Sequence, residues 1–173
     1  MLQNTPEAFA AQLRDGHYNE LRVALFYMLA GFHVRIGFQD GRFDIDLRHP
    51  RRPPRKVEVK WDKRASDSGN LYFEVENTRR RCPSGIMATG ADVWAHVLGE
   101  GQEAFLVTVP ALRKFLQDGR FRSVQTSGTD SNSRGVLVPL AAIPGEGPFR
   151  RVRLPTVEEY FGEIYRRGTS CSD

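Results

Sequence analysis

The chain has 173 residues, 40% of them hydrophobic, and a formal net charge of +4. These values are typical of a single globular domain that is long enough to bury a core. They exclude a helical membrane protein, because the longest nearly apolar stretch, residues 23–32, is far shorter than the roughly 18 residues that cross a bilayer.

Two features bear on the cellular compartment. Cys82 and Cys171 are too few and too isolated for a disulfide framework or a zinc site, which suits a reducing compartment. Residues 1–6 contain neither the basic nor the apolar region of a signal peptide. We therefore expect a cytoplasmic protein with no membrane partner.

The first part of the chain is predicted to be helical. One helix begins near Pro6, with Thr5 as its cap, and Gly16 is expected to end it. A second helix covers residues 18–30, where apolar residues recur at helical spacing, and Gly31 is its stop signal.

Three strands follow in the prediction. Residues 32–36 alternate apolar and polar side chains, and Asp40-Gly41 marks a turn into a second strand at residues 43–47. A third strand covers residues 57–60. The connection at residues 49–55 is rich in proline and arginine, which predicts an exposed loop.

The rest of the chain continues the α/β pattern within one domain, residues 1–173. In order, we expect a polar loop at 65–69, a strand at 71–76, paired strands at 91–98 and 104–109, a helix at 110–118, a mobile loop at 126–135, a strand at 136–143, and a helix at 157–166 that opens with the capping box Thr156/Glu159.

The candidate site lies on the second and third strands. Because a strand has a period of two, Glu58 and Lys60 share one face, and pairing of the two strands as a hairpin would bring Asp44 beside them. Two carboxylates beside a lysine suit a hard divalent cation such as Mg²⁺, and the Val59 carbonyl could supply a further oxygen ligand. Lys60 would then orient or deprotonate a water, or neutralise charge on a phosphate.

A simpler interpretation of the same residues stays open. Short Glu-x-Lys strings are common, and on a solvated strand they form only a favourable same-face pair. Other site chemistries have less support, since the sequence contains no nucleophile elbow, P-loop or dinucleotide-binding fingerprint, and its four histidines lack metal-ligand spacing. Trp61 and Trp94 are expected in the core.

The order of an aspartate strand followed by a Glu-x-Lys strand resembles the PD-(D/E)xK nuclease superfamily, in particular its phage-nuclease and Holliday-junction-resolvase-like branch. The resemblance implies a restriction-endonuclease-like mixed β-sheet flanked by helices, with a nuclease core at about residues 18–118 and a C-terminal extension at about 119–173. The matching pieces are Glu20 on a helix, Asp44, Glu58-Val59-Lys60 with Asp62, the strand ending in Glu74, and the run Pro83-Ser84-Gly85-Ile86 followed by Thr89-Gly90-Ala91-Asp92-Val93-Trp94.

The resemblance also implies an activity. It predicts a metal-dependent endodeoxyribonuclease that uses Mg²⁺, with Mn²⁺ able to substitute, and that acts in DNA recombination on duplex or branched DNA, including Holliday junctions. Its catalytic residues would be Asp44, Glu58, Lys60 and Glu20, and its metal ligands Asp44, Glu58 and Val59. A homodimer is the expected assembly, in the host cytoplasm if a phage encodes the chain.

Two departures from the pattern leave questions about the site. Phe43 stands where the family name has proline, and Asp46 offers a competing carboxylate on the face of Asp44. Asp44 is preferred because the family aspartate usually opens its strand. Glu20 has two open interpretations, a site carboxylate or a residue that complements the helix dipole. Glu74 is an open candidate for a supporting carboxylate.

Arginine dominates the basic residues, since only four of the 25 are lysines. Its planar fork suits phosphate recognition, although a GC-rich genome would also enrich arginine. We predict DNA contacts at Arg51, Arg52, Arg55, Lys63, Arg79 and Arg80, and treat the clusters at 150–153 and 166–167 as solvated surface. The alternative function is a nucleic-acid-binding domain of the same fold that cuts nothing; an intact Asp44, Glu58 and Lys60 favours the enzyme.

Overall fold

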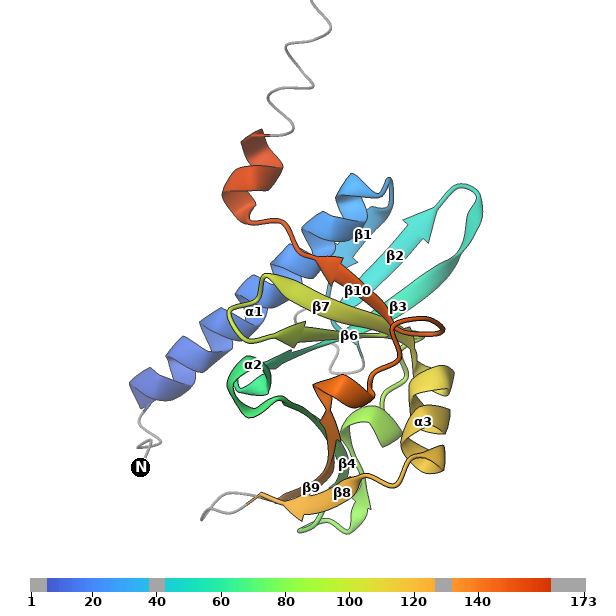
Figure 1. The fold of residues 1–173 in the computed structure, drawn as a ribbon. Helices are drawn as coiled ribbons and strands as arrows, with labels where there is room; N and C mark the ends of the chain where they lie inside the picture. Colours follow the sequence, from blue (N-terminus) through green and yellow to red (C-terminus); the bar gives the residue numbers. More distant parts are fainter. Residues whose placement is uncertain (1–5, 38–42, 127–131, 163–173) are drawn as a thin grey trace, which may run out of the picture.

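The computed structural model describes residues 6–37, 43–126 and 132–162 of the chain, which form two β-sheets with helices around them (Figure 1). The strand order of the six-stranded mixed sheet is β1-β2-β3-β6-β7-β10, and that of the four-stranded antiparallel sheet is β5-β4-β9-β8. The expected α/β class with a mixed sheet and flanking helices is confirmed.

The elements have the following bounds. The first sheet contains β1 (His33–Ile36), β2 (Ile45–His49), β3 (Arg52–Asp62), β6 (Val93–Leu98), β7 (Glu103–Thr108) and β10 (Arg150–Arg153). The second contains β4 (Asn70–Asn77), β5 (Cys82–Pro83), β8 (Arg122–Gln125) and β9 (Ser133–Pro139). The helices are α1 (Pro6–Leu29), α2 (Ala65–Ser68) and α3 (Val109–Asp118), with 3-10 turns η1 (Gly85–Met87) and η2 (Leu140–Ala142).

Helix α1 is continuous, so the prediction that Gly16 ends a first helix is wrong. One glycine inside a helix costs only about 1 kcal/mol relative to alanine, which the neighbouring turns tolerate. The predicted stop at Gly31 is confirmed: this residue has a φ of 87°, its N–H donates to the Met28 carbonyl at 3.0 Å, and the Phe32 N–H donates to the Tyr27 carbonyl at 3.1 Å. This pair of bonds is a Schellman motif, which satisfies the last carbonyls of the helix.

Strands β2 and β3 form the predicted antiparallel hairpin, with Ile45 opposite Val57 and Asp46 opposite Lys56. The predicted loop at residues 49–55 is wrong, because β3 begins at Arg52. Its first residues are bonded on the β2 side alone, since β6 pairs with β3 only from Val57 onward. Prolines are tolerated in a strand segment whose other edge is unpaired.

Two buried clusters form the core, one on each face of the first sheet. Side chains of α1 such as Val23 and Ala24 pack on one face, which contains Val57 and Val59. The other face packs on the second sheet and α3, and its centre is Trp94, which is 1% exposed. Trp61 is only half-buried and donates its indole N–H to the Gly99 carbonyl at 2.7 Å.

The C-terminal part of the chain adds strands to both sheets. Strand β9 pairs with β4, and β10 pairs with β7, so residues after 118 contribute to each sheet. The buried Arg22 of α1 donates to the Leu154 and Pro155 carbonyls at 3.2 and 2.9 Å, which fixes the segment after β10 against α1. The predicted capping box is present, with Thr156 and Glu159 each accepting a hydrogen bond from the backbone N–H of the other.

The remaining predictions have mixed outcomes. Residues 65–68 form a helical turn rather than a loop, and the segment predicted as the loop 126–135 includes the start of β9. Strands β8 and β10 were not predicted. The turn at Asp40-Gly41 and residues 163–166 of the last helix lie outside the described residues; the helix is present at 157–162. Within the described part of the chain, none of the helices combines the length and apolar character that crossing a membrane requires.

Candidate active site

The site lies at the N-terminal end of β2, where the pairing of β2 with β3 stops. Asp44 stands one residue before β2, and its N–H donates to the Val57 carbonyl at 3.0 Å. Among the described residues, this is the last backbone hydrogen bond between the two segments at this end. The next backbone group of β3, the Val59 N–H, donates to the Asp44 side chain instead, with Oδ2 as acceptor at 2.7 Å. The carboxylate is thereby fixed against the edge of β3 through Oδ2, and none of the described residues donates a hydrogen bond to Oδ1.

The same edge presents the backbone carbonyl of Val59. In a β-ladder the N–H and C=O of one residue point to the same neighbouring strand. Since the Val59 N–H points to Asp44, the Val59 carbonyl points to that side too. The even-numbered residues of β3 bond instead on the β6 side, as the bond from Asp92 N–H to the Lys56 carbonyl at 2.8 Å shows. The Asp44 carboxylate and the Val59 carbonyl oxygen therefore lie at the same edge of β3.

Glu58 and Lys60 lie together on the sheet face that packs toward the second sheet. The Lys60 Nζ is 3.1 Å from Glu58 Oε1, and the side chains are 51% and 15% exposed respectively. Glu58 Oε2 accepts a hydrogen bond from the Thr89 hydroxyl at 3.3 Å. Burial raises the pKa of Glu58 and the Asp44 charge raises it further, while Lys60 opposes both.

Helix α1 brings Glu20 into the same electrostatic neighbourhood. Burial raises the pKa of Glu20, and Asp44 is the largest charge that raises it further, while His17 and Lys60 lower it. Asp44, Glu58 and Lys60 thus lie together on and beside β3, and Glu20 lies on α1 within reach of their charges. They come from one helix and two strands that only the fold brings together.

Asp46 is directed to other partners. It lies opposite Lys56 in the hairpin, and its Oδ2 is 3.4 Å from Arg48 Nε. Asp44, in contrast, accepts a hydrogen bond from the Val59 N–H, one residue from Glu58. The geometry therefore places Asp44, the preferred aspartate, beside Glu58.

The donor set can be compared with what a divalent cation needs. Among the described residues, no three histidine, cysteine or acidic side chains are grouped closely enough to hold a metal ion by themselves. Mg²⁺ does not require such a cage, because it keeps several waters and binds through one or two carboxylates. Asp44 Oδ1, the Glu58 carboxylate and the Val59 carbonyl fit such a partly hydrated site, and burial together with the Asp44 charge raises the pKa of Glu58 even with Lys60 beside it.

Sequence reasoning did not find what supports Glu58. Thr89 belongs to the segment after η1, which Arg113 of α3 holds by donating to the Ile86 carbonyl at 2.9 Å and to the Thr89 carbonyl at 3.0 Å. Gly85 opens η1 with a φ of 51°, and a Cβ there would lie 2.4 Å from the Glu74 carbonyl oxygen. The run Pro83 to Trp94 was matched only as a family pattern.

A buried hydrogen-bond chain lies beside Lys60. His96 is 1% exposed; its Nδ1 accepts from the Trp94 indole N–H at 3.2 Å, and its Nε2 is 3.5 Å from Asp62 Oδ2. Because an indole N–H is only a donor, Nε2 carries the histidine proton in the neutral ring and donates it to Asp62. Burial alone would raise the pKa of Asp62, but hydrogen bonds from His96 and the Tyr72 and Arg64 N–H groups lower it overall. The sequence pattern of β6 did not predict these hydrogen bonds.

A cavity of about 520 Å³ adjoins this chain between the two sheets. Its lining includes Lys60, Lys63, Tyr72 and Glu74, so the predicted DNA-contact residue Lys63 lies near the site. The Lys63 Nζ lies over the Trp61 ring, 5.5 Å from its centroid.

The predicted arginines lie elsewhere. Arg52 is six residues from Glu58 along β3, a distance of about 20 Å at the rise of a strand. Arg51 lies at the hairpin tip, and Arg55 shares the sheet face of Val57, opposite the face of Glu58. Arg79 and Arg80 are exposed in the turn between β4 and β5. The DNA contacts predicted for these arginines therefore stay a prediction, separate from the site at Glu58 and Lys60.

Comparison with known proteins gave one structural likeness. No protein-family model and no curated protein sequence matches the chain. Among solved structures, the chain is similar to the bacterial homing endonuclease I-Ssp6803I, with a TM-score of 0.47 and 15% sequence identity over 91% of this chain and 95% of that chain. The function proposed below rests on this chain's own residues.

Proposed function

We propose that this protein is a metal-dependent endonuclease that hydrolyses phosphodiester bonds in DNA. The observation that supports it best is the convergence of Asp44, Glu58 and Lys60 at the point where β2 leaves the edge of β3. Two carboxylates, a carbonyl and an ammonium group would then surround one spot at which a phosphate binds. The resemblance to PD-(D/E)xK nucleases names the same three residues.

Each residue has a role that follows from its chemistry. Asp44, Glu58 and the Val59 carbonyl would hold Mg²⁺ or Mn²⁺, which when bound polarises the scissile phosphate and activates water. Lys60 is half exposed beside Glu58, so its ammonium group can turn to the phosphate or to the attacking water and neutralise charge that develops there. Glu20, whose pKa is raised, would accept or hold a proton at the edge of the site.

Within this function, branched DNA is the substrate that we propose, with four-way junctions as the main case. One chain supplies one site, whereas resolving a junction needs two symmetric cuts. A two-fold dimer would provide two sites at a fixed separation. Phe161, which is 61% exposed, is available for such an interface, while Phe149 is buried in the monomer core.

The test is incubation of the protein with labelled duplex, single-stranded, forked and four-way-junction DNA, with Mg²⁺, with Mn²⁺ and with a chelator. We expect cleavage only with a metal ion, and fastest on the junction. Light scattering coupled to size exclusion measures the assembly. A monomer that cuts linear duplex as fast as junctions would leave a general nuclease.

One observation favours the alternative of a binding domain without activity. In the absence of a metal ion, Glu58 and Lys60 neutralise each other, and the described residues contain no acidic triad. Metal-independent DNA binding without cleavage of any of these substrates would support this alternative and overturn the enzyme.

A further inference from the structure

A cavity of about 880 Å³ lies on the α1 face of the first sheet. Its lining comes from the C-terminal end of α1, from the β2–β3 hairpin and from β10. We call it the arginine groove and define it by six of its lining residues: Phe26, Tyr27, Arg52, Arg55, Arg150 and Arg153. Its volume lies within the range of ligand-binding pockets.

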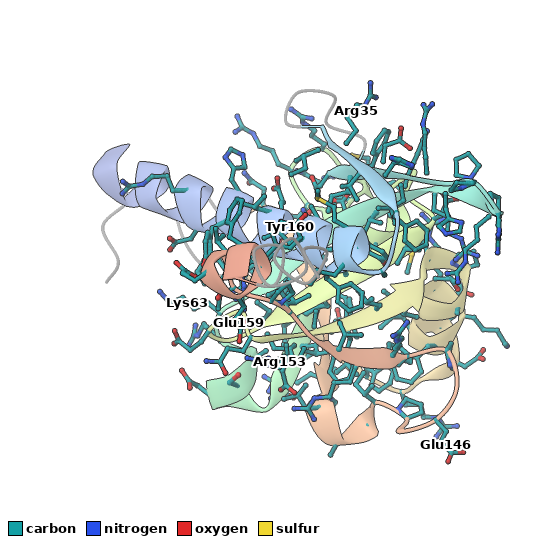
Figure 2. All side chains as sticks on the ribbon, turned by 90° about the horizontal axis from the view of Figure 1, so that it is seen from above. Arg35, Lys63, Glu146, Arg153, Glu159 and Tyr160 are labelled. Carbon is teal, nitrogen blue, oxygen red and sulfur yellow. The ribbon has the colours of Figure 1, made fainter. Side chains whose placement is uncertain are left out.

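The arginines of the groove have few protein partners. No carboxylate in the described part of the chain lies within ion-pair distance of Arg52, Arg55 or Arg150, and all three are exposed. Arg153 is paired with Glu159 at the rim, where Figure 2 labels both side chains. Three uncompensated guanidinium groups thus surround one cavity, and they suit an anionic occupant.

Aromatic rings form the inner wall of the groove. The Arg52 guanidinium carbon lies 5.5 Å from the centroid of the Phe32 ring, and that of Arg150 lies 5.9 Å from the Phe26 ring. Tyr27 packs edge-on against both Phe26 and Phe32. Guanidinium groups close to half-buried aromatic rings offer flat surfaces on which nucleobases can stack.

The groove is separate from the candidate active site. Arg55 and Glu58 lie on opposite faces of β3, three residues or about 10 Å apart along the strand. The sheet lies between them, so a strand held in the groove does not meet the repulsion of Asp44 and Glu58. Binding there requires no metal ion.

The arginines and aromatic rings of the groove favour some ligands over others. A second copy that presented the same face would bring two arginine clusters together, which like-charge repulsion disfavours. An acidic peptide would satisfy the arginines but leave the aromatic wall without flat partners. Duplex DNA stacks its bases internally, whereas a single strand offers both phosphates and free base faces.

We propose that the arginine groove is a second nucleic-acid-binding site that holds single-stranded DNA. Arg52, Arg55 and Arg150 bind its phosphates, and its bases stack against the guanidinium planes and the rings of Phe26 and Phe32. The site extends the proposed function, because it would hold an unpaired strand of a branched substrate, yet it operates without cleavage.

Fluorescence anisotropy of labelled oligo(dT) with the full chain and a chelator tests the proposal. We expect the double variant Arg52→Ala/Arg150→Ala to lose at least about tenfold in affinity. Its salt slope should become shallower by about 1.4, since each phosphate contact to a single strand contributes about 0.7. The matched control Arg120→Ala/Arg122→Ala removes the same charge from exposed positions near β8 and should change affinity less than twofold.

Two further variants separate stacking from charge and binding from catalysis. Arg52→Lys/Arg150→Lys keeps the charge and should keep the salt slope, but it should lose several-fold in affinity because lysine does not stack as a plane. Lys60→Ala should bind oligo(dT) like the unmodified protein even when it cuts nothing, so failure of the nuclease proposal leaves this one intact.

Three outcomes would overturn the proposal. Equal losses in the groove and control variants would show that the chain binds by general charge alone. Tighter competition by an acidic peptide than by unlabelled oligo(dT) would assign the groove to a protein partner. Dissociation of a dimer by Arg52→Ala/Arg150→Ala, measured by light scattering, would assign it to a second copy.

Discussion

The two faces of β3 differ in what burial does to their charged residues. On one face, Glu58 is largely buried beside Asp44 and Lys60, and burial raises its pKa. On the other face, Arg55 lines an open groove with Arg52 and Arg150, and these three arginines have no acidic partner among the described residues. Carboxylates therefore gather on one side of β3, and arginines without acidic partners gather on the other side.

The difference shows how a single strand can serve two ligands. Neighbouring residues of a strand point to opposite faces of the sheet. The sheet therefore separates carboxylates from arginines that would neutralise each other in a single pocket. A cation suits the acidic face, and a phosphate suits the basic one. The variants below test whether these two faces act independently.

The largest effect is expected at the acidic face. Lys60→Ala should reduce cleavage by about 10²–10³-fold or more, because a charge that forms in the transition state loses its positioned cation. Metal binding, measured by calorimetry, should persist. Lys114→Ala, an exposed lysine on α3, is the control and should cut normally. Undiminished cleavage by Lys60→Ala would falsify the assignment.

The two aspartates of the hairpin sharpen the comparison. Asp44→Asn should abolish metal-dependent cleavage and weaken metal binding, since it removes an anionic oxygen next to Glu58. Asp46→Asn should remain active within a few-fold, because Asp46 lies with Arg48 and Lys56. A dead Asp46→Asn with a live Asp44→Asn would reverse the choice of ligand. Glu58→Gln should behave like Asp44→Asn.

The hydrogen-bond chain behind Lys60 predicts a pH-dependent loss of stability. Asp62→Asn should lower the free energy of unfolding by about 1–3 kcal/mol at neutral pH, since His96 and two backbone N–H groups lose a charged acceptor. The folded pKa of Asp62 is lowered, so its contribution is present above the ordinary value of 3.8 and disappears as the pH falls through the folded pKa.

Urea unfolding of both proteins from pH 7 to pH 3 measures this effect. The difference between the unmodified protein and Asp62→Asn should shrink below about pH 4. The exposed Asp67→Asn of α2 is the matched control and should show little difference at any pH. A constant difference across the range would mean that Asp62 acts through packing rather than charge.

A smaller effect is expected from the residue that supports Glu58. Thr89→Val removes the hydroxyl that donates to Glu58 Oε2 while keeping the shape of the side chain. A typical hydrogen bond contributes about 1 kcal/mol, so cleavage should fall by roughly fivefold. The loss should be recovered in part by Thr89→Ser. Equal activity of Thr89→Val and the unmodified protein would show that the hydroxyl of Thr89 does not position Glu58 for cleavage.

An effect confined to high pH is expected on the basic face. Burial raises the pKa of Tyr27 to about 12, although Arg150 and Arg55 oppose the shift. The folded protein should therefore lose stability as the pH rises from about 10 toward 12, because the unfolded chain ionises this phenol first. A spectrophotometric titration should show a late-ionising tyrosine that Tyr27→Phe removes. Ionisation of Tyr27 near pH 10 would show an open, solvated groove wall.

Local pattern was sufficient for the hairpin and for the residues at its end. The alternation of 43–47 and 57–60 predicted two strands, and their period of two placed Glu58 with Lys60. Gly31 was recognised as the helix stop, since a positive φ at the C-terminus of a helix favours glycine. Gly16 and residues 49–55 misled, because a long helix tolerates one glycine and the start of β3 tolerates prolines.

The amino-acid sequence by itself determined which side chains share a face of β3, because strand geometry fixes that locally. Only the tertiary structure decided what each face meets: α1 and the open groove on one side, the second sheet on the other. The parallel pairing of β3 with β6 joins Lys60 to His96, 36 positions later, and so brings Asp62, His96 and Trp94 into one chain. Such contacts depend on long-range pairing, for which a local period carries no information.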